Sequence, residues 1–244
     1  MKITYQDALA YYGIDGAHPG GMSLTKAILE NEKMDNKKII LDAGCGTGET
    51  SLYLARTFHC KVYSLDNHEE MVTKVTQKFL NARISAQVLK GSIENIPFPD
   101  HFFDYIIAES STVFANIPKV LSEYFRVLKH GGVLLTIDMT AEQKLSRKEK
   151  EELLNFYELQ DILTEKEWLM DIQKAGFNKC QIVKSASIFG TLEQYDFEDN
   201  EMIERNMKLI NVNPEVDEVM ESHQRLLIQY GEKLGYRVFR AEKI

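Results

Sequence analysis

The sequence contains little cysteine, no long apolar run and fewer positive than negative charges. It has three cysteines in 244 residues and no C-x-x-C pair, so neither a zinc site nor a disulfide framework is predicted. No apolar stretch approaches the length that spans a bilayer, and Met1–Asp7 contains no apolar signal core. These features favour a cytoplasmic protein with no membrane span and no bound metal.

The balance of charged residues limits the classes of molecule that the protein is expected to bind. Lys and Arg total 29 against 37 Asp and Glu, which gives a net charge of −8. A general nucleic-acid binder needs a basic surface, so the composition favours a small-molecule partner and leaves the oligomeric state open. A hydrophobic fraction of 44% is ordinary for a globular protein, and the length fits one large domain.

The strongest local signal is residues 39–48, Ile-Ile-Leu-Asp-Ala-Gly-Cys-Gly-Thr-Gly. The apolar start is typical of a buried parallel strand, and the glycines permit a tight turn on which a ligand can lie. A helix is predicted from Glu49 onward, so the loop opens onto free helical N–H groups that attract polar or anionic ligand groups. The spacing is not that of a dinucleotide loop, because Glu49 or Ser51 stands where the third glycine is needed. Taken alone, the loop would suit many nucleotides or none.

A second strand is predicted over residues 61–66 and ends in Asp66, eighteen residues beyond the last loop glycine. A carboxylate at this place in a β-α-β unit can accept hydrogen bonds from both ribose hydroxyls. Asp66 could instead be a solvated strand end or a helix cap. Asn67 and Glu70 form a capping-box pattern, which leaves Asp66 for a ligand. Met71, in the same helix, either packs on an adenine or fills the core.

Glu109 ends a strand predicted over residues 100–110, at the edge where open α/β sheets bind their ligands. It either contacts substrate or cofactor, or caps the next helix. The other predicted elements are strands over 86–90, 180–185 and 236–241, a helix from Ser23 or Thr25 to about Met34, helices beginning at Asn116 and Thr164, and helical patterns near 197–211 and 214–234.

Residues 1–21 combine tyrosines with clustered glycine and proline, which predicts a loop. One interpretation is an arm packed on the domain, in which His18 is an ordinary loop histidine. The other is a flap over the active site, in which Tyr11, Tyr12 or His18 touches the substrate or the cofactor.

In their order and spacing these motifs resemble the class I S-adenosylmethionine-dependent methyltransferases, closest in style to the bacterial group that includes the quinone-biosynthesis C-methyltransferases. The resemblance covers residues 39–138, with a weaker match over 160–186. It implies an α/β, Rossmann-like fold with a seven-stranded, mostly parallel sheet, helices on both faces, a reversed last strand and a helical cap. The motifs that carry it are Asp42 with the glycine loop, Asp66, the 91–98 loop, Asp104 to Glu109, and Gly131-Gly132.

The resemblance also implies a cofactor site. The glycine loop would receive the methionine part of S-adenosylmethionine, with Asp42 near its amino group, while Asp66 would hold the ribose. Ser92 and Ile93 would meet the adenine edge, although the family has Asp in the place of Ser92. The predicted cofactor-binding residues are Asp42, Gly44, Cys45, Gly46, Gly48, Asp66, Asn67, Met71, Ser92, Ile93 and Glu109.

A single domain is expected, with an N-terminal arm and helix over 1–36 and a cofactor-binding core over 37–186. The roughly fifty residues between the last two strands are too many for a hairpin. Residues 187–235 are therefore predicted to form a helical cap insertion ahead of the last strand, 236–244. The cap and the arm would together cover the substrate.

The resulting hypothesis is transfer of a methyl group from S-adenosylmethionine to a small-molecule acceptor, which leaves S-adenosylhomocysteine. Because a sulfonium is already an activated leaving group, alignment and desolvation can supply much of the rate. A general base is needed only for an acceptor that stays protonated, and His18 and Glu109 are the candidates. The alternatives are a peptide or protein amine methyltransferase and a non-catalytic S-adenosylmethionine-binding protein. The acceptor atom, O, N, S or C, stays open.

Overall fold

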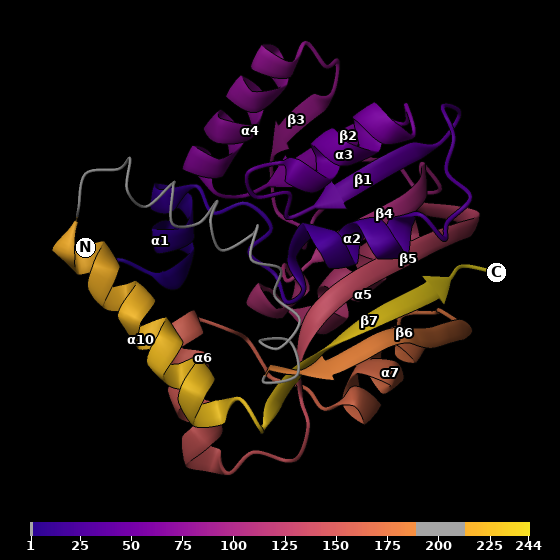
Figure 1. The fold of residues 1–244 in the computed structure, drawn as a ribbon. Coiled ribbons are helices and arrows are strands. Elements are labelled where there is room, and N and C mark those ends of the chain that lie inside the picture. The colour runs from indigo at the N-terminus through magenta and orange to yellow at the C-terminus, as the bar shows by residue number, and fades with distance from the viewer. Residues whose placement is uncertain (1, 189–212) are drawn as a thin grey trace.

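The computed structural model describes residues 2–188 and 213–244, so the helical pattern predicted near 197–211 lies outside the described residues. Its centre is a seven-stranded sheet in the order β3-β2-β1-β4-β5-β7-β6 (Figure 1). The strands from β3 to β5 pair in parallel, whereas β7 runs antiparallel to β5 and β6. The predicted mostly parallel sheet with a reversed last strand is confirmed. The strands are β1 (Ile39–Ala43), β2 (Lys61–Asp66), β3 (Gln87–Lys90), β4 (Phe103–Glu109), β5 (Leu128–Ala141), β6 (Lys179–Ser187) and β7 (Leu234–Glu242).

Helices cover both faces of the sheet, which explains why its strands are apolar without strict alternation. In β1, Ile40 belongs to the same buried cluster as Leu54 of α3, whereas Leu41 shares a cluster with Leu121 of α5. One face carries α2 (Gly21–Leu29), α3 (Glu49–Thr57) and α4 (Glu69–Ala82), and the other carries α5 (Ile117–Val127) and α7 (Glu165–Lys174).

The carboxyl ends of β1, β2 and β4 lie at one edge of the sheet. The chain winds from β1 outward in both directions there, and such a switch point is where open α/β sheets bind ligands. Beyond this edge gather α1 (Tyr5–Tyr12), α6 (Arg147–Tyr157) and α10 (Pro214–Tyr230), as Figure 1 shows. The edge is therefore covered by segments that lie far apart in the sequence.

The N-terminal residues differ from the prediction because they are not a loop throughout. Thr4 and Asp7 form a capping box that starts α1. The next helix, α2, starts at Gly21 and not at the predicted Ser23 or Thr25, because Gly20 takes the N-cap position with φ of 82°, which suits glycine. It ends at Leu29, short of the predicted Met34. The predicted starts at Asn116 and Thr164 are confirmed as N-caps of α5 and α7.

The first helix, α1, packs on α10 from the C-terminal part of the chain. Tyr12 and Ala8 of α1 are buried against Val216 of α10. The helix predicted over 214–234 ends at Tyr230, and β7 begins at Leu234, two residues before the predicted strand. Within the described ranges, no helix has the length and apolar character needed to cross a membrane.

The glycine loop predicts a stability difference between two of its glycines. A Cβ at Gly48, where φ is 83°, would lie 2.2 Å from Cγ2 of Val75 in α4, whereas a Cβ at Gly46 would meet nothing within 4 Å. Gly48→Ala should therefore lower the free energy of unfolding by at least about 2 kcal/mol, through strain and overpacking combined. Gly46→Ala, with φ of 52°, is the matched control and should cost about 1 kcal/mol. Urea denaturation of both variants measures the difference, and equal losses would contradict the packing described.

Candidate active site

The glycine loop, residues 44–48, is clamped between two neighbours at the switch point. Its first two N–H groups donate to the carbonyl oxygen of Leu65 in β2, at 2.8 and 3.0 Å. On the other side Ser111, just after β4, donates its hydroxyl to the carbonyl of Ala43 at 2.6 Å. A Cβ at Gly44 would lie 2.3 Å from the Ser111 side chain. Only glycine therefore fits where the loop leaves β1.

Asp66 fixes the loop from the end of β2. Its Oδ2 accepts the N–H of Gly46 and its Oδ1 accepts the N–H of His68, each at 2.9 Å. The predicted Asn67–Glu70 capping box is absent, because His68 is the N-cap of α4 and the Asp66 carboxylate closes the turn instead. The Asp66 carboxylate is therefore partly occupied by backbone N–H groups. Since a carboxylate has about four acceptor positions, two remain for further donors.

Asp42 is almost fully buried beneath the loop. Its side chain is 2% exposed, and Ser51 of α3 donates to its Oδ2 at 2.6 Å. Burial raises the pKa of the Asp42 carboxyl to about 7, although the hydrogen bond from Ser51 acts in the opposite direction. The neighbouring carboxylates of Glu109 and Asp66 add to the increase. Three acidic side chains therefore influence one another around the loop.

Glu109 and His18, the two predicted acid–base candidates, lie together. The Nε2 atom of His18 is 3.6 Å from Oε1 of Glu109, and both side chains are at most 10% exposed. Thr25 of α2 donates its hydroxyl to Oε1 of Glu109, and Thr50 of α3 donates to Oε2. Neither threonine was identified as a functional residue in the sequence, where Thr25 was assigned only to a helix cap. A signal for Thr50 existed in its place in the first turn after the glycine loop.

The site carries concentrated, uncompensated negative charge. Asp42, Asp66 and Glu109 all lie at the same sheet edge, and in the described part of the chain none of them pairs with a lysine or arginine. His18 is the one basic side chain in contact with the group among the described residues. Burying like charges without cations is costly, so the arrangement favours a ligand that brings positive charge.

The predicted adenine end is more open. Ser92 is exposed and its Oγ accepts the N–H of Glu94 at 3.1 Å, while Ile93 is partly buried against the main core. Asn67 is exposed, and Met71 is half-buried in the first turns of α4. Cys45 in the loop is buried, and burial raises the pKa of its thiol. The raised pKa keeps this thiol in its neutral, unreactive form.

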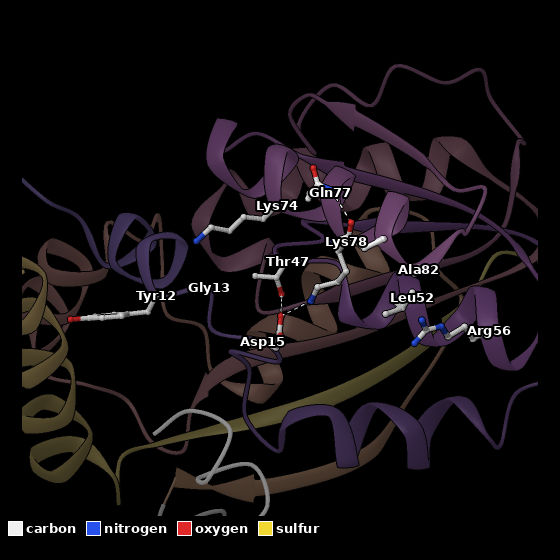
Figure 2. Close-up of a pocket in the computed structure, with 11 residues that line it drawn as sticks. Tyr12, Gly13, Asp15, Thr47, Leu52, Arg56, Lys74, Gln77, Lys78 and Ala82 are labelled. Carbon is white, nitrogen blue, oxygen red and sulfur yellow. Dashed lines mark hydrogen bonds and ion pairs between the residues drawn. The ribbon is translucent and has the colours of Figure 1, made fainter. Parts of the chain in front are cut away.

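The tyrosines of the arm face the cap. Tyr12 is 4% exposed and donates its hydroxyl to Asp217 of α10. Burial first, and then this partner, raise the pKa of Tyr12 to about 12. Tyr11 packs edge-on against Tyr12, with the ring centroids 5.2 Å apart. Figure 2 shows the Tyr12 side chain directed toward α10 and away from Thr47 of the glycine loop.

A groove of about 630 Å³ separates the arm from α4 (Figure 2). Within it the hydroxyl of Thr47 and the ammonium of Lys78 both donate to Asp15 of the arm, the latter at 2.8 Å. Lys74 donates to the carbonyls of residues 10 and 11, and His68 lies 3.1 Å from Asp7. The arm is thus fastened to both loops that surround the carboxylates.

Comparison with known proteins agrees with this architecture. A family model described as "Methyltransferase domain" matches residues 40–132. The chain is 28% identical to the uncharacterized methyltransferase YodH of Bacillus subtilis over 239 residues, which cover 98% of this chain and 99% of the relative. A solved structure of Haemonchus contortus phosphoethanolamine N-methyltransferase 2 with S-adenosylmethionine superposes with a TM-score of 0.79 at 20% identity. The superposition covers 97% of this chain but only 56% of the Haemonchus contortus chain, so this chain spans little more than half of that protein's length.

A second solved structure, a putative sarcosine dimethylglycine methyltransferase from Galdieria sulphuraria, has a TM-score of 0.72 at 19% identity and covers 91% of this chain and 84% of its own. At these identities the solved structures establish the fold, which is that of the class I methyltransferases. In the domain match over 40–132, in the full-length relative and in fold, the chain is thus similar to the class I S-adenosylmethionine-dependent methyltransferases.

The raised pKa of Asp42 predicts a pH-dependent stability. Between about pH 4 and pH 7 the folded state keeps the Asp42 proton that the unfolded state loses, so the free energy of unfolding falls as pH rises across this window. Asp42→Asn removes that dependence. From pH 4.5 to pH 7.5, the free energy of unfolding of the variant should therefore rise by at least about 1 kcal/mol relative to that of the wild type.

Urea denaturation of both proteins at the two pH values measures the gain. Asp100→Asn is the control, because Asp100 is exposed and its pKa is lowered by the hydrogen bond from Arg126. The free energy of unfolding of Asp100→Asn should not rise relative to that of the wild type between these two pH values. If the free energy of unfolding changed equally with pH in the wild type and in Asp42→Asn, the raised pKa of Asp42 would be contradicted.

Proposed function

We propose that the chain transfers the methyl group of S-adenosylmethionine to a small-molecule acceptor. One observation carries the proposal: around the glycine loop Asp42 and Asp66 are buried, Glu109 has a side chain only 10% exposed, and none of the three has a lysine or arginine partner in the described ranges. S-adenosylmethionine brings a sulfonium and an ammonium group, and its methyl is activated for transfer by the sulfonium.

The charge argument separates this ligand from a dinucleotide. At an effective dielectric constant of about 20, two unit charges about 6 to 8 Å apart interact by roughly 2–3 kcal/mol. The carboxylates of Asp66 and Glu109, joined by that of Asp42 above its pKa of about 7, therefore attract a cationic ligand and repel the two phosphates of NAD. The N–H groups at the start of α3 offer a locally positive feature, which suits the single carboxylate of the methionine part.

The residue roles follow from this placement. The backbone of Gly44, Cys45, Gly46 and Gly48 would receive the methionine part above Asp42. Asp66 would use its remaining acceptor positions for the ribose hydroxyls, beside Asn67. We propose Met71, Ser92 and Ile93 for the adenine, with Ser92 as the weakest contact because its hydroxyl is exposed and already accepts from Glu94.

The cap supports a small acceptor with apolar or aromatic surface. Tyr5 of α1 lies 5.1 Å from Tyr157 of α6 and 4.7 Å from His223 of α10, between ring centroids. Burial lowers the pKa of His223 to about 4, so its ring is neutral near pH 7. An uncharged aromatic wall gives a cationic peptide side chain no counter-charge. Two relatives are also named for small acceptors. One is a sterol 24-C-methyltransferase, 36% identical over 98 residues, and the other is a phosphoethanolamine N-methyltransferase, 26% identical over 161 residues.

The cellular setting proposed is the cytoplasm. All three cysteines are free, and Cys45 and Cys60 are buried. For Cys60, burial raises the pKa to about 11. Thiols kept in this form are compatible with a reducing compartment.

Ligand binding tests the proposal directly. Calorimetric titration should show binding of S-adenosylmethionine and S-adenosylhomocysteine and none of NAD. Asp66→Ala should weaken adenosyl binding at least tenfold, because losing charged hydrogen bonds costs about 1.5–3 kcal/mol. Asp66→Asn is the matched control for the loop, since its amide oxygen can still accept the Gly46 N–H. Binding of NAD without the adenosyl compounds would overturn the proposal, and acceptor screening with S-adenosylhomocysteine release as readout follows a positive result.

A further inference from the structure

Three polar side chains from separate elements form a chain of contacts beside the glycine loop. Thr25 of α2 is 1% exposed. Its hydroxyl oxygen contacts Oε1 of Glu109, at the end of β4, and lies 3.1 Å from Nε2 of His18. The far side of the imidazole is anchored as well, since Nδ1 lies 3.2 Å from the carbonyl oxygen of Pro19. The hydroxyl thus stands between a carboxylate and an imidazole.

Proton accounting restricts what this chain can hold. A carbonyl oxygen only accepts, so Nδ1 of His18 must donate to Pro19. The Thr25 hydroxyl has one proton and can donate it to Glu109, to His18 or, more weakly, to the carbonyl oxygen of Gly21 at 3.4 Å, but only to one of them at a time. With Glu109 ionised and His18 neutral, one of the two contacts therefore lacks a proton.

One added proton completes both contacts, and it can lie at either end. If it sits on His18, Nε2 donates to Thr25 and Thr25 donates to the Glu109 carboxylate. If it sits on Glu109, the carboxyl donates to Thr25 and Thr25 donates to Nε2. The two forms differ only in a shift of protons through the hydroxyl, which is the arrangement of a hydrogen-bonded relay.

We propose that Thr25 links Glu109 and His18 into a proton relay that takes up the proton released by the methyl acceptor. The inference rests on the proposed function. The acceptor's lone pair forms the new bond to the methyl carbon, the electron pair of the broken carbon–sulfur bond stays on sulfur, and the acceptor's proton passes to Glu109 and through Thr25 to His18. Glu109 is the group that would meet the acceptor, and Thr25 is a positioning residue.

Further acidic side chains surround the relay. The side chains of Asp42 and Asp66 face the same region and add negative charge, and in the part of the chain that the structure describes no lysine or arginine contacts the relay. Thr50 donates to the other oxygen of Glu109 and contacts Met22, not His18. It therefore holds the same carboxylate without belonging to the relay, which makes it the matched control.

The test is an NMR double-mutant cycle on full-length protein with 15N-labelled histidine, with His18 assigned through His18→Gln. In the wild type, Glu109→Gln should change both ring 15N shifts of His18. The change should persist in Thr25→Ser and Thr50→Val backgrounds and fall at least about threefold in Thr25→Val, because the coupling runs through the hydroxyl.

Equal coupling in Thr25→Val and the wild type would overturn the relay, as would a loss of coupling in Thr50→Val as large as that in Thr25→Val. Failure of Thr25→Ser to restore the wild-type signals would also overturn it. Calorimetry with S-adenosylhomocysteine on the same samples separates the two proposals. Absent binding counts against the methyltransferase function and leaves the relay result readable, whereas binding with no coupling counts against the relay alone.

Discussion

The carboxylate of Asp66 holds the site together. One oxygen accepts the N–H of Gly46 and the other that of His68, so a single side chain fixes both the glycine loop and the turn into α4. His68 in turn reaches Asp7 of α1. The end of β2 therefore fixes the positions of the glycine loop, the turn into α4 and the arm, all at the switch point of the sheet.

This edge of the sheet concentrates negative charge on poorly exposed side chains, where proteins usually avoid it. Burying Asp42, Asp66 and Glu109 within one region lowers stability in the absence of cations, and the raised pKa of Asp42 reports the cost. Function explains why such a cost is tolerated. A ligand with sulfonium and ammonium groups offsets it on binding, so part of the binding free energy comes from relieving repulsion within the protein.

Much of the fold was readable from the sequence, because its signals are local. Apolar runs that end in Asp42, Asp66 and Glu109 predicted three strands and placed their acidic ends at one edge. The helix cap at position 67 failed because a tertiary partner, the Asp66 carboxylate, replaced the local one. Thr25 could not be identified, since its role depends on His18 and on Glu109, 84 residues away. Residue type and spacing carry no information on a tertiary contact between residues so far apart in the sequence.

The fastening of α1 to α10 has a consequence for biosynthesis. Tyr12 finds Asp217 across 205 residues, and β7 must slide between β5 and β6 after both have been made. During synthesis the first strands can pair as they leave the ribosome. The cover of the site cannot close until residues 214–242 have emerged, so a nascent chain carries its acidic loops open to solvent until then.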